Sequence, residues 1–220
     1  MLLIFGSRLD DQPWLLAEHL ARFDVSPAVV IPFDLSRPGW RLRTGRAGAL
    51  QAATADRVIG SGQIAAVVNL LPWITVHDLP HIAEDDREYV ANEMAAFLLG
   101  WLCELDCPMI DRPTSLSLAG CGRWPSEWAA LAMRVGVRAD TQWQGPRVDV
   151  TVLGGCAVAE PGGDRRLARA AEAVAHAARR SLVTLHFAQD DHEPIFVGAA
   201  ARPMAGTPAV ADALRAWLPR

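Results

Sequence analysis

The 220-residue sequence predicts an α/β protein, with a mainly parallel sheet in an N-terminal domain and a shorter α+β domain after it. In the first half of the chain, short apolar segments alternate with helical patterns, which is typical of strands buried on both faces of a parallel sheet. The second half has strands joined by glycine and acidic turns, which is typical of antiparallel hairpins. The pattern changes after Arg112 and Pro113, so we expect domains over residues 1–113 and 114–220.

The N-terminal domain is predicted to form around residues 85–113, whose pattern indicates a long helix, a short strand and a turn. Apolar residues at helical spacing, among them Leu98 and Trp101, give this helix one wide buried face. Upstream we expect a helix that Asp11 caps and a hairpin or ribbon within residues 40–52. The expected strands of this domain are residues 2–5, 28–33, 64–69 and 109–110.

The C-terminal domain is predicted from its turn and capping residues. Ser126 is expected to cap a helix that stops at Gly136, and Asp164 opens a second helix. Gly154 and Gly155 are expected to form the turn of a hairpin. The expected strands are residues 147–153, 156–159, 182–187 and 195–199, and a last helix begins at residues 207–208.

Composition excludes several classes of function. The chain is 51% hydrophobic and 21% charged, with a formal net charge of −4, so we expect a globular protein without a nucleic-acid surface or a polybasic membrane anchor. The apolar start of the chain is too short for a signal peptide or a membrane span, which indicates a cytoplasmic protein. All 21 basic residues are arginine. The sequence therefore offers no lysine nucleophile, no Schiff base and no lysine to bind phosphate.

Several short strings in the first half carry a resemblance. They are Val67-Val68-Asn69, residues 86–93 (DREYVANE), residues 99–102 (LGWL), residues 110–113 (IDRP) and Leu118-Ala119-Gly120. In order and spacing they resemble the pre-ATP-grasp domain of ATP-grasp carboxylate–amine ligases, especially the graspetide and ribosomal-protein glutamate ligase branch. The resemblance implies that the N-terminal domain packs beside a nucleotide-binding fold.

The second half resembles only the last portion of that fold. In the family, a strand ending in an acidic residue and a Glu-x-Asn string hold magnesium on the ATP phosphates. Here His186, Gly198 and Ala200 stand at those positions, and residues 135–147 leave little room for the lid-bearing subdomain. The resemblance therefore implies a truncated ATP-grasp-like domain without a metal, a cofactor or catalytic residues. The alternative is an active site that still uses ATP and magnesium, with His186 and Arg112 in the remodelled roles.

Five residues are candidates for ligand binding: Asn69, Glu93, Arg112, His186 and Arg202. Arg112 follows a strand at the edge where open parallel sheets bind ligands, and its guanidinium suits a carboxylate or a phosphate. It is equally compatible with an internal pair to Glu93 or Asp111. His186 is most simply a strand histidine, and it becomes a general base only if an acid or an amide orients it.

Two clusters resemble metal sites without predicting one. His77 and His81 are four apart beside several acidic residues, but Pro80 interrupts the helix that would place both imidazoles on one face. A solvated acidic loop before the long helix is the preferred interpretation. The acidic turn at residues 190–193 is likewise interpreted as an exposed hairpin tip, so no metal site is predicted.

Tryptophans indicate contact surfaces. Five of the eight lie in or beside predicted loops, where large rings often anchor an interface: Trp14, Trp40, Trp73, Trp124 and Trp143. We therefore expect a homodimer or a complex with a partner enzyme, and a peptide or a small molecule as further ligands. The predicted function is a catalytically inactive accessory or scaffold protein. The alternative is an ATP-dependent carboxylate–amine ligase, or another transferase, with a remodelled arginine and histidine site.

Overall fold

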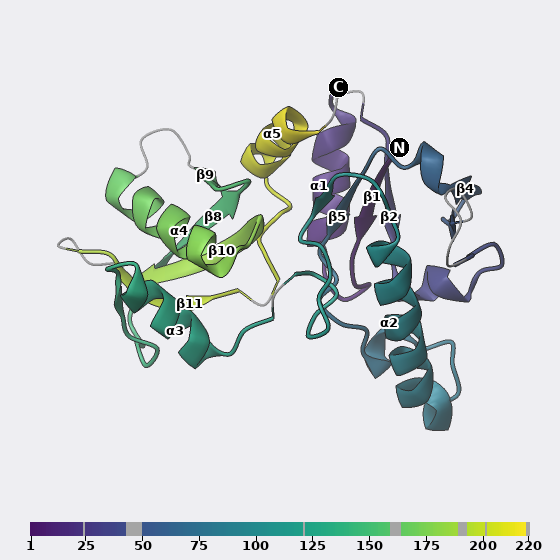
Figure 1. Ribbon diagram of the computed structural model, residues 1–220, viewed down its shortest axis with the longest axis horizontal. Coiled ribbons are helices and arrows are strands. Elements are labelled where there is room, and N and C mark those ends of the chain that lie inside the picture. Colours follow the sequence, from purple (N-terminus) through teal and green to yellow (C-terminus); the bar gives the residue numbers. More distant parts are fainter. Residues whose placement is uncertain are drawn as a thin grey trace. The chain divides into compact units, whose positions relative to one another are not determined.

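The computed structural model describes residues 1–23, 25–42, 50–120, 122–158, 164–188, 193–200 and 202–218 (Figure 1). The chain divides into two compact units, residues 1–120 with 218–220 and residues 121–217. The division falls after Gly120, whereas the sequence placed it after Pro113. Residues 114–120 stay with the first unit because the Leu118 N–H donates to the Pro72 carbonyl at 2.9 Å.

The first unit is built on a parallel sheet with the strand order β2-β1-β5-β6. Its strands are β1 (Leu2–Phe5), β2 (Pro27–Val30), β5 (Ala66–Asn69) and β6 (Met109–Ile110), and every neighbouring pair is parallel. All residues of β1 and β5 are buried, as expected for strands covered on both faces. The predicted parallel sheet is confirmed.

Helices cover both faces of this sheet. The helix α1 (Gln12–Ala21) packs against β1 and β2. The opposite face carries Leu3, Phe5 and Val67, which share a core with Trp101 and other residues of α2 (Arg87–Cys103). The predicted long helix is therefore present, and it supplies one of the two outer layers. Among the 3₁₀ segments described in this unit are Ser61–Gln63, Val76–Asp78 and Glu84–Asp86.

The predicted strand at residues 28–33 was too long. β2 ends at Val30, and Pro32–Ser36 form a 3₁₀ helix. Pro32 has no N–H to give to a strand ladder, and the Asp34 carboxylate accepts the Ile31 N–H at 3.1 Å instead. Phe33 is left 39% exposed.

Two further predictions of the first unit change in detail. The Asp11 side chain does not cap α1; the Asp10 carboxylate accepts the Gln12 N–H at 3.1 Å. Of the predicted hairpin within residues 40–52, residues 43–49 lie outside the described residues. Arg41 and Gln51 form an isolated antiparallel bridge at its base. The strand β3 (Gln51–Ala53) pairs with β4 (Val58–Gly60) in a small separate sheet.

The second unit holds a mixed sheet with the order β7-β11-β10-β8-β9. The strands are β7 (Arg138–Ala139), β8 (Arg147–Leu153), β9 (Cys156–Val158), β10 (Leu182–Ala188) and β11 (Ile195–Ala199). Only the β7–β11 pair is parallel among these. Residue 159, the glycines at 162–163 and residues 190–192 of the acidic turn fall outside the described residues.

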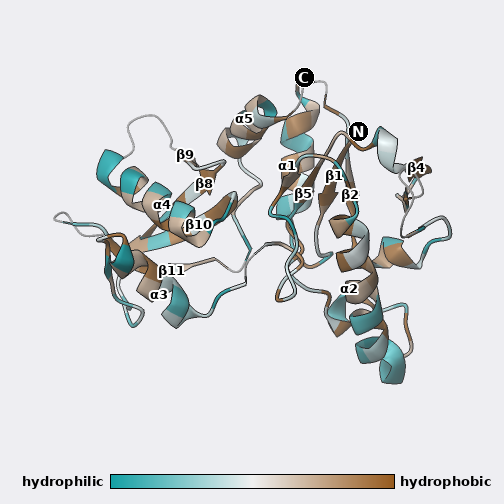
Figure 2. Ribbon diagram, in the orientation of Figure 1, coloured by the Kyte–Doolittle hydropathy of each residue, from teal (hydrophilic) through white to brown (hydrophobic). Residues whose placement is uncertain are grey.

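Three helices surround this sheet. The helices α3 (Pro125–Arg134) and α4 (Arg165–Ala178) share a core with Val152, Val183 and Phe187 of the sheet. The helix α5 (Pro208–Trp217) packs against β8 and β9. In Figure 2 α4 carries both hydrophilic and hydrophobic residues, and its alanines and Val174 form the buried side. The predicted α+β unit is present.

The ends of these elements confirm most of the predicted turns. Gly136 follows α3 with φ +83°, and Gly154 and Gly155 turn β8 into β9 with φ +59° and +88°. The predicted Ser126 cap is wrong, because α3 begins at Pro125 and Ser126 already lies in its first turn. Trp124 is the capping residue, and its N–H donates to the Glu127 carboxylate at 2.7 Å. None of the described helices combines the length and the apolar character that crossing a bilayer requires.

Candidate functional site

His186 and Asp149 form a close pair on the sheet of the second unit. They lie opposite each other on β10 and β8, and His186 Nδ1 is 2.7 Å from Asp149 Oδ1. The His186 side chain is 13% exposed and that of Asp149 30%. Asp149 also lies 3.6 Å from the Arg147 guanidinium. The sequence left His186 without an orienting acid, and the structure supplies one.

The direction in which the backbone N–H and C=O groups of β8 point explains why the Asp149 and His186 side chains meet. The Ala157 N–H donates to the Glu172 carboxylate at 2.9 Å, so it points away from β8. Its register partner Val152 therefore directs its own backbone groups towards β10. Hydrogen-bonded and non-hydrogen-bonded residue pairs alternate along two antiparallel strands. Val152 and Val183 form a hydrogen-bonded pair, so Asp149 and His186, three positions further along, form a pair without backbone hydrogen bonds to each other. Pairs of this kind hold their side chains closer together than hydrogen-bonded pairs do.

Two threonines continue the same face of the sheet. Thr151 and Thr184 lie opposite each other, and their hydroxyl oxygens are 2.8 Å apart. Thr184 is completely buried, and its hydroxyl accepts the Met204 N–H at 2.8 Å. The Thr184 carbonyl accepts the Ala200 N–H at the same distance. Thr184 therefore fastens the segment after β11 onto the sheet beside His186.

Gly198 lies directly across from His186 on the other neighbouring strand, β11. A Cβ atom at Gly198 would be 3.6 Å from His186 Cδ2, which is an ordinary contact. Two of the three positions at which the sequence resemblance expects magnesium ligands are therefore adjacent, and they carry an imidazole and a hydrogen atom. Magnesium prefers oxygen ligands. No group of three or more His, Cys, Asp or Glu side chains in the described residues is arranged to hold a metal ion, and the side chains of His186 and Gly198 offer magnesium no oxygen ligand.

A groove of about 680 Å³ is lined by residues 148–151 of β8 and by Val158 of β9. The start of α4 lines one side of it, and Met204 with the start of α5 lines the other. Its walls are mostly apolar, with Val148, Val150 and Val210 among them. Three carboxylates also line the groove: Asp149, Asp164 and Asp212.

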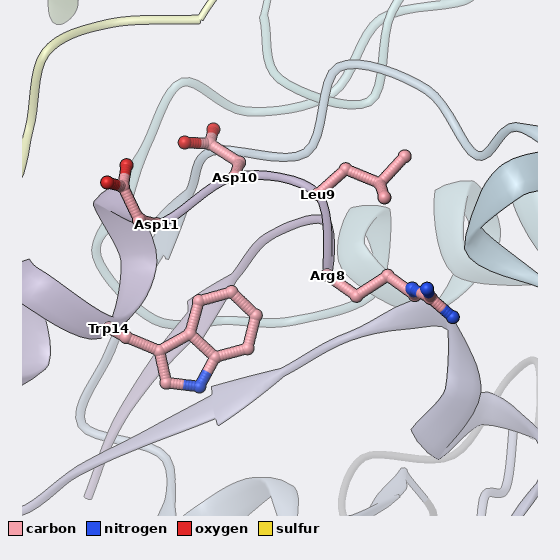
Figure 3. Close-up of a pocket in the computed structure, with 5 residues that line it drawn as sticks. All are labelled: Arg8, Leu9, Asp10, Asp11 and Trp14. Carbon is pink, nitrogen blue, oxygen red and sulfur yellow. The ribbon is translucent and has the colours of Figure 1, made fainter.

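The first unit has an open pocket of about 610 Å³ at the carboxyl end of β1 (Figure 3). Figure 3 shows the carboxylates of Asp10 and Asp11 on one side and Arg8 on the other, with the Trp14 ring facing the same space. The Gln12 side chain donates to Asp11 at 3.1 Å, and its N–H donates to Asp10. The Asp10 carboxylate therefore helps to start α1, and the Asp11 carboxylate pairs with the Gln12 side chain.

Comparisons with protein-family models and with curated proteins give no match to this sequence. Solved structures do match. The macrocyclase MdnC from Microcystis aeruginosa, bound with the precursor peptide MdnA, is 10% identical with a TM-score of 0.68, over 99% of this chain and 100% of that one. A RiPP-associated ATP-grasp ligase from Chryseobacterium gregarium, in complex with ADP and a leader and core peptide, is 10% identical with a TM-score of 0.67, over 100% and 97%. The ATP-grasp ligase PsnB, complexed with minimal precursor, Mg and ADP, is 12% identical with a TM-score of 0.63, over 98% and 97%.

The chain has an ATP-grasp-like fold. The likeness extends over the whole chain although at most 12% of the residues are identical in these three structures. The fold predicted from the short strings of the first half and the matching string of the second is therefore confirmed. The likeness extends to fold alone, so the chemistry has to be argued from this chain's own residues.

Within this ATP-grasp-like fold, Asn69 has structural partners. Its side chain is buried, its Nδ2 donates to the Leu118 carbonyl at 2.5 Å and its Oδ1 accepts the Leu71 N–H at 3.2 Å. Arg202 is half-buried after β11, and Glu93 is exposed on α2. Asn69 and Glu93 belong to the first unit, and Arg202 and His186 belong to the second.

Arg112 lies at the end of β6 with an exposed side chain. Its guanidinium donates to the carbonyls of Leu105 and Cys107 at 3.3 and 3.0 Å, rather than to Glu93. These bonds tie the strand end to the loop after α2. Burial raises the pKa of the Cys107 thiol, although the nearby Arg112 charge opposes that effect. Arg112 belongs to the first unit and His186 to the second.

In the described residues, His77 and His81 do not belong to a group of side chains that could hold a metal ion. His81 Nε2 is 2.8 Å from the Ser36 hydroxyl, and the ring contacts Phe33 edge-on. His77 is exposed. The neighbouring Asp78 is completely buried and accepts hydrogen bonds from Thr75 and Ser7. These contacts fit the loop that the sequence suggested.

Proposed function

We propose that this protein acts by binding a peptide segment, as a cytoplasmic accessory protein to a partner enzyme or to a second copy of itself, and does not carry out ATP-dependent ligation. One observation carries this proposal. His186 and Gly198 face each other in register at the positions where the resemblance expects magnesium ligands. Neither side chain provides an oxygen for magnesium. Without the metal, the charge of a transferred phosphoryl group is left unneutralised.

Three further observations support the proposal. The carboxylate beside His186, that of Asp149, is already shared with His186 and Arg147. The chain contains no lysine to bind the phosphates. The structures of similar fold include complexes with precursor peptides, so a peptide is a ligand class that this fold accommodates elsewhere.

The proposal is tested by measuring the release of ADP and phosphate. The purified protein is incubated with Mg-ATP and a glutamate- and lysine-containing peptide, beside an active ATP-grasp ligase as the positive control. We expect no release above the blank. Release that disappears in His186→Ala and persists in the matched surface variant His77→Ala would contradict the proposal.

A second function is favoured by the 2.7 Å contact between His186 and Asp149. With Nδ1–H donating to Asp149, the Nε2 atom is the basic nitrogen, which is the arrangement of a general base oriented by an acid. This tautomer is inferred from the contact. The test is hydrolysis of p-nitrophenyl acetate. A general base predicts a rate that falls in both His186→Gln and Asp149→Asn, whereas equal rates in all three proteins would exclude the role in this reaction.

A further inference from the structure

We propose that the pocket at the carboxyl end of β1 binds a peptide through an arginine side chain, which stacks on the Trp14 ring and pairs with the Asp11 carboxylate. The inference rests on the proposed function, because it names a site and a residue class for that peptide binding. The described residues that line the pocket all belong to the first unit (Figure 3): Arg8, Leu9, Asp10, Asp11 and Trp14.

Contacts beneath the pocket hold the loop between β1 and α1 in place. Ser7 is buried, and its hydroxyl donates to the Asp78 carboxylate at 2.5 Å and accepts the Leu9 N–H at 3.1 Å. Pro13 packs so closely on Gly6 that position 6 has no room for a Cβ atom. A surface that is ordered in this way before binding loses less conformational entropy when a ligand binds.

Two large apolar side chains of this loop remain exposed. Leu9 is 53% exposed and Trp14 is 42% exposed. Neither belongs to the core that the parallel sheet shares with α2. Among the described residues, no aromatic ring or guanidinium stacks on Trp14. Because an indole ring is the best aromatic partner for a cation, Trp14 offers a stacking surface to a ligand.

The charges around Trp14 favour a cation at this ring. The carboxylates of Asp10 and Asp11 lie on one side of the pocket (Figure 3), and together they outweigh the charge of about +0.5 at the start of α1. Asp11 is exposed and forms no ion pair within the described part of the chain. The Gln12 side chain donates to Oδ1 of Asp11. The other carboxylate oxygen of Asp11, Oδ2, is therefore the acceptor that we assign to the ligand.

A guanidinium suits this arrangement better than an ammonium does. It is planar, so it can lie flat on the Trp14 ring while the N–H groups at its edge donate to a carboxylate. An ammonium is a compact and more strongly hydrated charge, and it presents no flat face to the ring. The ligand side chain is therefore expected to be arginine rather than lysine.

The remaining two side chains indicate that this arginine belongs to a peptide. Leu9 lies between Asp10 and Arg8 along the loop in Figure 3, and its exposed side chain suits an apolar neighbour of the arginine. Arg8 is exposed and has no ion pair with any described side chain, so it suits an acidic residue beyond that neighbour. We therefore expect a segment that carries a basic, an apolar and an acidic residue in succession.

The probe is a blocked pentapeptide of glycine, arginine, leucine, glutamate and glycine, labelled with a fluorophore and titrated by anisotropy at low salt. The reversed sequence is titrated beside it, because the pocket does not fix the direction of the chain. We expect one of the two to bind, and glutamine in place of its arginine should weaken binding about tenfold. N-acetylarginine amide, the probe for a small guanidinium ligand, should bind more weakly than the peptide.

Two variants of the protein test the assigned contacts. Asp11→Asn and Trp14→Leu should each weaken binding of the arginine peptide about two- to fivefold, and Trp14→Phe should weaken it less because an aromatic face remains. Binding of the glutamine peptide should stay within about twofold in all three, since it lacks the cation. The matched variants Asp56→Asn and Trp124→Leu change an exposed carboxylate and an exposed ring elsewhere, and should bind as the wild type does.

Several results would overturn the inference. They are equal binding of the arginine and glutamine peptides, equal loss of both peptides in Trp14→Leu, and no binding of the arginine peptide in either direction. Binding of N-acetylarginine amide as tight as that of the peptide would also overturn it, because the ligand would then be a small guanidinium compound.

The two proposals fail in different ways. Peptide binding that is unchanged in Asp11→Asn and Trp14→Leu removes the pocket as the site but leaves a peptide-binding protein. His186-dependent release of ADP with Mg-ATP removes the proposed function, while binding at the pocket is still decided by these two variants.

Discussion

Buried polar side chains hold the loops at the carboxyl ends of the parallel strands. Asn69 links the end of β5 to residues 71 and 118, and Asp78 accepts from the Thr75 N–H at 2.9 Å and from its hydroxyl at 2.8 Å. Buried polar groups that lose such partners pay the desolvation penalty in full. At this scale the side chains of the first unit act as loop anchors.

Asn69→Ala should lower the free energy of unfolding by about 2 kcal/mol, because the Leu71 N–H and the Leu118 carbonyl lose their partner. Urea denaturation followed by circular dichroism measures this change. Asn92→Ala is the control, since Asn92 is exposed on α2 and alanine is the better helix former. An unchanged midpoint in Asn69→Ala would contradict the anchoring role and return Asn69 to the ligand candidates.

The helices and their ends carry the second group of predictions. Gly100 lies inside α2, and a Cβ atom there would meet Leu42 Cδ2 at 3.2 Å. Gly136 ends α3 at φ +83°, where a Cβ atom meets no other atom within 4 Å. A side chain added at position 100 is therefore limited by contact with the end of Leu42, which can move. A side chain added at position 136 is limited by the backbone conformation.

Gly100→Ala should stabilise the protein by about 0.5 kcal/mol, because the end of the Leu42 side chain can move and alanine favours the helix. Gly136→Ala should destabilise it by about 1 kcal/mol, because an L residue is strained in the left-handed conformation. Thermal unfolding of Gly100→Ala, Gly136→Ala and the wild type measures both changes in stability. Destabilisation by Gly100→Ala would show that Leu42 is fixed in place.

Asp164 gives α4 a charged N-cap, and hydrogen bonds from Arg166 hold the pKa of its carboxyl below the ordinary value of 3.8. Because the folded pKa is the lower one, the ionised carboxylate stabilises the folded state above pH 3.8, and this contribution is lost as the pH falls through the folded pKa. Asp164→Asn should therefore be less stable than wild type at neutral pH, and the difference should shrink in acid. Urea midpoints from pH 7 to about 3 measure it. A constant difference would contradict this account.

Most elements of the fold could be predicted from local patterns. Apolar runs located β1, β5 and β6, and Gly154, Gly155 and Gly136 located turns and a helix end, because these signals act within a few residues. The predicted strand at 28–33 is too long because Pro32, which has no N–H for a strand ladder, begins a 3₁₀ helix. The Asp149–His186 pair could not be predicted from the sequence. The alternation of residues in β8 puts Asp149 on its polar face, but which residue lies opposite it depends on the register between strands.

At the scale of the whole molecule, an ATP-grasp-like fold is combined with two side chains that offer magnesium no oxygen ligand at positions where the resemblance expects such ligands. The strand positions that carry this statement, His186 and Gly198, are adjacent in the sheet of the second unit. The central claim is that the molecule binds a peptide and not a nucleotide.

Thermal unfolding with and without millimolar Mg-ATP, ADP and AMP tests that claim most directly. At about a hundredfold excess over the dissociation constant, a bound nucleotide would add about 2.7 kcal/mol to the folded state and raise the midpoint by several degrees. We predict the same midpoint with and without each nucleotide. A reproducible rise with Mg-ATP that is lost in His186→Ala would contradict the account.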